Sequence, residues 1–122
     1  MYVAGAANPN REPARKLLAR VGNRELDAVT STEVLQEILH RYVAINRRDA
    51  IQPAFDAVLG IVDEVFPVDQ ASTQRAKEIL FGNRALSARD AIHLAIMERE
   101  GVEEILSFDS GFDGFPGVQR KS

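Results

Sequence analysis

Cysteine and tryptophan are both absent from this chain, and histidine occurs only twice. The lack of cysteine excludes disulfide bonds, thiolate metal ligands and cysteine catalysis. Any bound metal must therefore be held by oxygen or imidazole ligands. Such ligands favour Mg²⁺ or Mn²⁺ over structural zinc.

Several familiar sequence signals are also missing. There is no apolar run long enough to cross a bilayer, and the first residues lack the basic and apolar segments of a signal peptide. No glycine-rich phosphate loop, HExxH pair or nucleophile elbow is present. We therefore expect a soluble, cytoplasmic protein without a membrane segment, and a site of another chemical type.

Size and charge narrow the possibilities further. The chain has 122 residues, which predicts a single domain over residues 1–122. Its net charge is −3, whereas a protein that binds nucleic acid by charge alone is usually basic. A nuclease is still allowed, because a carboxylate cluster attracts phosphate once metal is bound.

Hydrophobic periodicity predicts alternating helices and strands. Helices are expected at residues 12–21, 31–45, 49–59, 69–81 and 87–101, and strands at 26–30, 61–68 and 102–108. This alternation is typical of a parallel sheet covered by helices on both faces. The fold class predicted from the pattern is therefore α/β.

Acidic residues fall where the predicted strands end or the following helices begin. In an open parallel sheet, ligand sites form beyond the carboxyl ends of the strands. Clustered carboxylates repel one another unless a cation is bound, and Mg²⁺ prefers carboxylate oxygen. The candidate metal ligands are Glu37, Asp90, Asp109 and, more loosely, Asp113.

Each acid also has a purely structural interpretation. Glu33 fits a capping box that begins at Thr30, and Asp90 fits a similar box that begins at Ser87. Asp109 is followed by Ser-Gly, which is ordinary turn chemistry. Glu37 lies beyond the first helical turn, so its alternative is a solvated helix face.

Three further polar residues lie near these acids in the sequence. His93 follows Asp90 by three residues and shares its helix face. It could orient a carboxylate, touch substrate or be an ordinary partly buried histidine. His40 stands three residues after Glu37. Ser107 precedes Asp109 by two residues, so both point to the same side of a strand.

Taken together, three ordered motifs resemble the PIN domain family. Thr30–Ile38 resembles the segment in which a strand ends in Ser and a helix presents a Glu, which identifies Glu37 as the metal-site acid. Ser87–Ala95 resembles the motif that supplies the second acid, here Asp90. Ile105–Asp113 resembles the last motif, with Asp109 as its acid.

The resemblance covers nearly the whole chain and is closest to VapC-like toxins of type II toxin–antitoxin modules. It implies a PIN-like three-layer α/β/α fold with a mostly parallel sheet. It also implies an endoribonuclease that depends on Mg²⁺ or Mn²⁺ and acts on tRNA, rRNA or mRNA. A homodimer and neutralisation by a cognate antitoxin are further implications.

The N-terminus departs from the family pattern. Family members open with a central strand that ends in an Asp, whereas the first acid here is Glu12. We interpreted Met1–Ala4 as the start of the helix that normally follows, so the central strand is expected to be missing. Either the N-terminus is shortened or the copy is degenerate, and in both cases we expect weak metal binding and poor RNA cleavage.

Two alternative functions remain open, and the first rests on the missing Asp. The first is a catalytically impaired PIN-like protein that binds an antitoxin or RNA. The second is an unrelated α/β module whose acids serve only as helix caps, and it predicts no stabilisation by Mn²⁺.

Overall fold

The computed structural model describes residues 1–4, 27–106 and 119–121. Its strands are β1 (Tyr2–Val3), β2 (Val29–Ser31), β3 (Glu64–Phe66), β4 (Glu104–Leu106) and β5 (Gln119–Lys121). Its helices are α2 (Thr32–Ala44), the 3₁₀ helix η1 (Arg48–Ala50), α3 (Ile51–Ile61), α4 (Gln70–Gly82) and α5 (Ala88–Glu100). The helix predicted at residues 12–21 lies outside the described residues.

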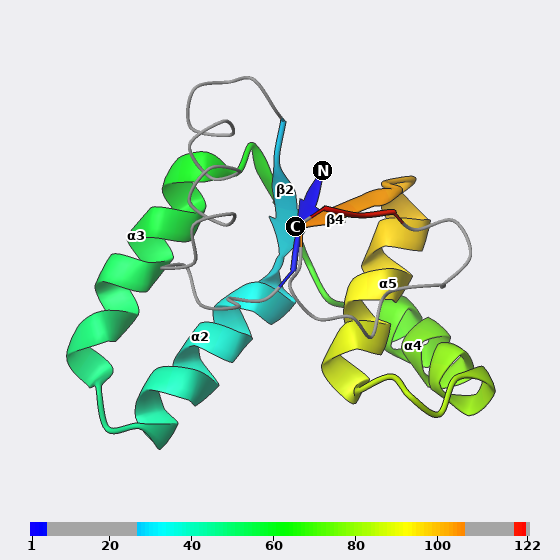
Figure 1. Cartoon of the computed structure of the whole chain (residues 1–122), viewed down its shortest axis with the longest axis horizontal. Helices are drawn as coiled ribbons and strands as arrows, with labels where there is room; N and C mark the ends of the chain where they lie inside the picture. Colours follow the sequence, from blue (N-terminus) through cyan, green and yellow to red (C-terminus); the bar gives the residue numbers. More distant parts are fainter. Residues whose placement is uncertain (5–26, 107–118, 122) are drawn as a thin grey trace.

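The strands form one parallel sheet in the order β3-β2-β1-β4-β5. Figure 1 shows α2 and α3 on one side of this sheet and α4 and α5 on the other. The α/β class and the three-layer arrangement predicted from the sequence are thus confirmed. None of the helices in the described ranges is both long and apolar enough to cross a membrane.

The expectation of a missing central strand is wrong. Tyr2 and Val3 form β1, which occupies the middle of the sheet and pairs with β2 on one side and β4 on the other. The helical interpretation of Met1–Ala4 fails because successive side chains of a strand point to opposite faces, and here both faces are buried. Tyr2 is fully buried in one core and Val3 is buried in another.

The two cores lie on opposite faces of the sheet and differ in size. The larger packs Tyr2 and Ile105 against α4 and α5, and its other buried members are Ala4, Ala76, Ile79, Ala91, Leu94, Ala95, Ile96 and Met97. The smaller contains Val3, Ala28 and Leu106, with Met1, Ile61 and Val62 packed against it. The candidate residues of α5 therefore lie on the helix that packs against Tyr2 and Ile105.

Most helix boundaries agree with the sequence pattern. Pro53 lies in the first turn of α3, where its missing N–H costs nothing. Gly101 ends α5 with a φ of 70°, the left-handed conformation that glycine adopts most easily. The strand predicted at residues 61–68 shrinks to Glu64–Phe66, because Ile61 is still the last residue of α3.

The residues predicted to face the core on α2 and α5 need a minor correction. Leu39 was expected to face the core, but 43% of it is exposed. Ala88 is also exposed, whereas Ala91 and Ile96 are fully buried as expected. Val34 and Ile38 are the buried hydrophobic residues of α2.

Candidate functional site

Two of the four predicted acids lie in the described part of the chain. Glu37 is in the second turn of α2, which begins directly after the carboxyl end of β2. Asp90 is in the first turn of α5, and its side chain is partly buried. Asp109 and Asp113 lie outside the described residues, as does Ser107.

The structure brings Glu37 against α5 through a histidine. Nε2 of His93 lies 2.7 Å from Oε1 of Glu37, and the two side chains are 1% and 11% exposed. His93 is one turn along α5 from Asp90, so both project from the same face of that helix. His93 therefore contacts a carboxylate, which fits the first of the three roles that the sequence left open.

The histidine is itself held from the opposite side of its ring. Nδ1 of His93 is hydrogen-bonded to the hydroxyl of Tyr2, and that hydroxyl lies 2.7 Å from Oγ of Ser31. Ser31 in turn accepts a bond from the backbone N–H of Glu33 at 3.3 Å. We call Ser31, Tyr2, His93 and Glu37 the buried relay, since these four side chains link β2, β1, α5 and α2.

Burial governs the protonation of the phenol in this relay. Removal of the Tyr2 hydroxyl from water raises its pKa well above the usual value, the bond from Ser31 opposes the shift, and the nearby charges of Glu37 and Glu33 add to it. Tyr2 therefore remains a phenol at neutral pH. It can donate one hydrogen bond while it accepts another.

Glu33 lies next to this site but outside the relay. Burial raises the pKa of its carboxyl, and the charge of Glu37 adds to the rise, while His93 opposes it. The N-cap of α2 is Ser31 rather than the predicted Thr30, whose hydroxyl instead donates to the carbonyl of Val3 at 2.7 Å. The capping box predicted from Thr30 to Glu33 is therefore wrong by one residue at its start.

The cap of α5 agrees with the sequence. Ser87 is its N-cap and accepts a bond from the backbone N–H of Asp90 at 3.2 Å. Because the backbone of Asp90 makes this bond, its carboxylate is not required for it. His40, the other histidine, is exposed on α2.

The described ranges do not contain a complete metal site. Within residues 1–4, 27–106 and 119–121, no three His, Asp or Glu side chains are close enough together to hold an ion. The carboxylate ligand set itself suits a hard cation such as Mg²⁺.

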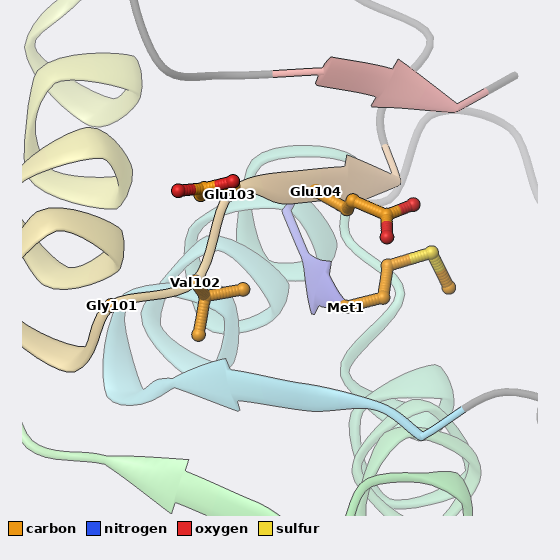
Figure 2. Close-up of a pocket in the computed structure, with 5 residues that line it drawn as sticks. All are labelled: Met1, Gly101, Val102, Glu103 and Glu104. Carbon is orange, nitrogen blue, oxygen red and sulfur yellow. The ribbon is translucent and has the colours of Figure 1, made fainter.

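A separate hollow lies at the other end of the sheet. It has a volume of about 300 Å³ and is lined by Met1, Gly101, Val102, Glu103 and Glu104. Figure 2 shows these residues at the points where β1 and β4 begin. Glu37 follows the carboxyl end of β2, so this hollow is not part of the candidate site.

Sequence reasoning missed Tyr2 as a site residue. A strand of two residues is too short to show periodicity. The hydroxyl of Tyr2 also contacts His93, which is 91 positions away in the sequence. Whether Tyr2 is buried depends on contacts in the folded protein, which the sequence pattern does not show. The meeting of Glu37 and His93, 56 positions apart, was equally invisible.

Comparison with known proteins places this chain in a family. The family model described as "PIN domain" matches residues 1–118. Ribonuclease VapC13 of Mycobacterium tuberculosis is 48% identical over 120 residues, which cover 98% of this chain and 92% of that protein. Ribonuclease VapC23 of the same species is 36% identical over 109 residues and covers 89% of this chain and 86% of its own length.

Solved structures agree with the fold. The crystal structure of M. tuberculosis VapC20, described as a sarcin–ricin loop cleaving toxin, superposes with a TM-score of 0.74 at 25% identity, covering 97% of this chain and 98% of that one. The VapBC2 structure from Rickettsia felis gives 0.72 at 12% identity, with 98% and 97% covered. With its motifs, its parallel sheet and these relatives in agreement, the chain belongs to the PIN domain family.

Proposed function

We propose that this protein is a divalent-metal-dependent endoribonuclease, the toxin component of a toxin–antitoxin module, which hydrolyses RNA phosphodiester bonds. The observation that carries the proposal is the 48% identity to a named ribonuclease across 98% of the chain. The position of Glu37 and Asp90, on helices next to the middle of the sheet, supports it.

The residues that would hold the metal are Glu37, Asp90 and Asp109, with Asp113 as a fourth candidate. All are carboxylates, the ligands that Mg²⁺ and Mn²⁺ prefer. Such an ion, when bound, activates water and neutralises charge on the phosphodiester. The raised pKa of Glu33 is a sign that this corner of the fold already disfavours additional negative charge.

The chain's own groups prepare this site. His93 holds Oε1 of Glu37, which leaves the other carboxylate oxygen for the ion. The backbone N–H of Asp90 is used by the cap at Ser87, so the first turn of α5 is fixed beneath its carboxylate. Fixing both helices reduces the entropy lost when a ligand binds.

Substrate, partners and location follow from the relatives. We propose RNA as the substrate (tRNA, rRNA or mRNA), a cognate antitoxin as the inhibitor, a homodimer as the assembly and the cytoplasm as the site of action. The VapBC and toxin–antitoxin structures with the same fold are consistent with an antitoxin partner. The ribonuclease relatives do not favour a non-catalytic binding module.

The experiment is a cleavage assay on purified protein with total tRNA and rRNA at millimolar Mn²⁺ or Mg²⁺. We expect slow, metal-dependent cleavage that EDTA abolishes and that Asp90→Asn removes. Asp56→Asn is the matched control, since Asp56 is exposed on α3 and bonded only to Gln52 among the bonds described. No cleavage by the wild-type protein at any metal concentration, with folding verified, contradicts the proposal.

A further inference from the structure

The donor and acceptor of each hydrogen bond in the buried relay can be assigned from the chemistry of its groups. A carboxylate only accepts hydrogen bonds, so Nε2 of His93 must carry the hydrogen in its contact with Oε1 of Glu37. Nδ1 of a neutral imidazole is then an acceptor, and the hydroxyl of Tyr2 donates to it. The raised pKa of Tyr2 keeps this donor protonated.

The hydrogen positions at the other end of the relay follow from the bonds of Ser31. Oγ of Ser31 accepts from the N–H of Glu33, so its own hydrogen is available for the oxygen of Tyr2. The opposite direction would give Ser31 two donors and leave its hydrogen without an acceptor among the described bonds. All hydrogens of the relay therefore point toward Glu37, an arrangement in which each bond polarises the next.

From this arrangement we propose that His93 and Tyr2 are positioning residues that orient the carboxylate of Glu37 for metal binding. The inference rests on the proposed function, because it assigns Glu37 to the metal. Neither residue touches substrate. His93 is 1% exposed and Tyr2 is fully buried, so both act through Glu37.

The relay is anchored on rigid elements. Tyr2 lies in the central strand and Ser31 caps α2 from the end of β2, while His93 is on the most buried helix. The edge of the Tyr2 ring also packs on the ring of His93, with centroids 5.3 Å apart. A carboxylate on such a support loses little freedom when an ion binds.

Two substitutions at His93 separate its two bonds. In His93→Gln the amide nitrogen can reach the Nε2 position and still donate to Glu37, while the bond to Tyr2 is lost. In His93→Asn the shorter side chain can accept from Tyr2 but does not reach Glu37. Each variant therefore breaks one bond of His93 and keeps the other, and the melting temperature without metal gives the stability cost of each.

Mn²⁺ binding, followed by the rise in melting temperature, is the first measurement. We expect His93→Asn to weaken Mn²⁺ binding by about 10- to 100-fold, the usual effect of removing a group that orients a metal ligand. His93→Gln should retain most of the affinity, and RNA cleavage should follow the same order. Equal losses in both variants would show that His93 acts only through stability and would overturn the proposal.

A second measurement uses the wild-type protein alone. Nitrogen NMR of ¹⁵N-histidine-labelled wild-type protein should show His93 as the neutral tautomer with hydrogen on Nε2. A hydrogen on Nδ1 overturns the relay. His40 is exposed and serves as the internal reference.

The two proposals can fail separately. If the wild-type protein cleaves RNA and both His93 variants lose Mn²⁺ affinity equally, the relay is contradicted. The ribonuclease assignment then stands. Wild-type protein with the expected tautomer and the expected difference in Mn²⁺ binding, but without cleavage of RNA, contradicts the assignment and leaves the relay intact.

Discussion

The ring of His93 meets the ring of Tyr2 at 65°, with centroids 5.3 Å apart, and the same two residues share a hydrogen bond through Nδ1. A strand at the middle of the sheet is thereby joined to helix α5 by both a polar and a ring contact. Tyr2 is fully buried, so neither contact is diluted by solvent.

Tyr2→Phe should destabilise the protein measurably. The ring contact survives in this variant, but Nδ1 of His93 and Oγ of Ser31 each lose a partner in a buried site. We expect a loss of about 1–3 kcal/mol in the free energy of unfolding, measured by urea denaturation. Tyr42→Phe is the control, because Tyr42 lies at a partly exposed position on α2 and its replacement should change stability by less than about 0.5 kcal/mol. Equal effects at both positions would refute the importance of the relay for folding.

Stability should also fall at alkaline pH because of Tyr2. Its pKa is raised in the folded protein above the 10.0 of an exposed tyrosine, so above pH 10 the unfolded chain loses a proton that the folded chain keeps. The folded state then binds more protons, and the free energy of unfolding decreases as pH rises from about 10. Urea denaturation between pH 8 and 11 measures this slope, which should be smaller in Tyr2→Phe. A slope unchanged by that substitution would assign the decline to other groups.

Removing the charge of Glu33 and removing the charge of Glu37 should have different effects on stability and metal binding. Burial and the charge of Glu37 already disfavour the ionised form of Glu33, so Glu33→Gln should leave the metal-free melting temperature at least as high as in the wild type. Glu37→Gln should abolish both Mn²⁺-dependent stabilisation and RNA cleavage, since the amide is a poor substitute for a charged ligand. Thermal denaturation with and without Mn²⁺ compares the pair, and loss of metal response in Glu33→Gln would move the site to Glu33.

Two glycines offer a backbone test. Gly101 has a φ of 70° at the end of α5, so Gly101→Ala should cost about 1 kcal/mol even though the added methyl group meets no other atom. Gly60 lies inside α3 with equally open surroundings and no positive φ, so Gly60→Ala should gain about 0.5–1 kcal/mol. Chemical denaturation gives both values, and the same sign for both would contradict the backbone explanation.

The long elements were predictable because their apolar residues repeat. The helix expected at 31–45 is observed at Thr32–Ala44, and the one expected at 87–101 is observed at Ala88–Glu100. Strands were overestimated, since apolar residues such as Ile61 belong to the neighbouring helix. β1 was missed because two residues carry no period, and only pairing with β2 and β4 identifies them as a strand.

The acids of the candidate site come from the family motifs and stay a prediction, whereas the contacts around them could not be predicted from the sequence. Family motifs identified Glu37 and Asp90, which the fold places on α2 and α5. Their support by His93 depends on contacts between elements far apart in the chain. The sequence showed that His93 shares a helix face with Asp90, but not that its ring would meet Glu37.

The two residues of β1 have a consequence for cooperativity. Tyr2 belongs to the core under α4 and α5, Val3 belongs to the core on the other face, and their backbones bond to β2 and β4. Neither layer can open without exposing one of these side chains. This dipeptide thus links the two helical layers in addition to the contact between His93 and Glu37, so their loosening is coupled, and the amide hydrogens of β1 should exchange with solvent only when the whole sheet comes apart.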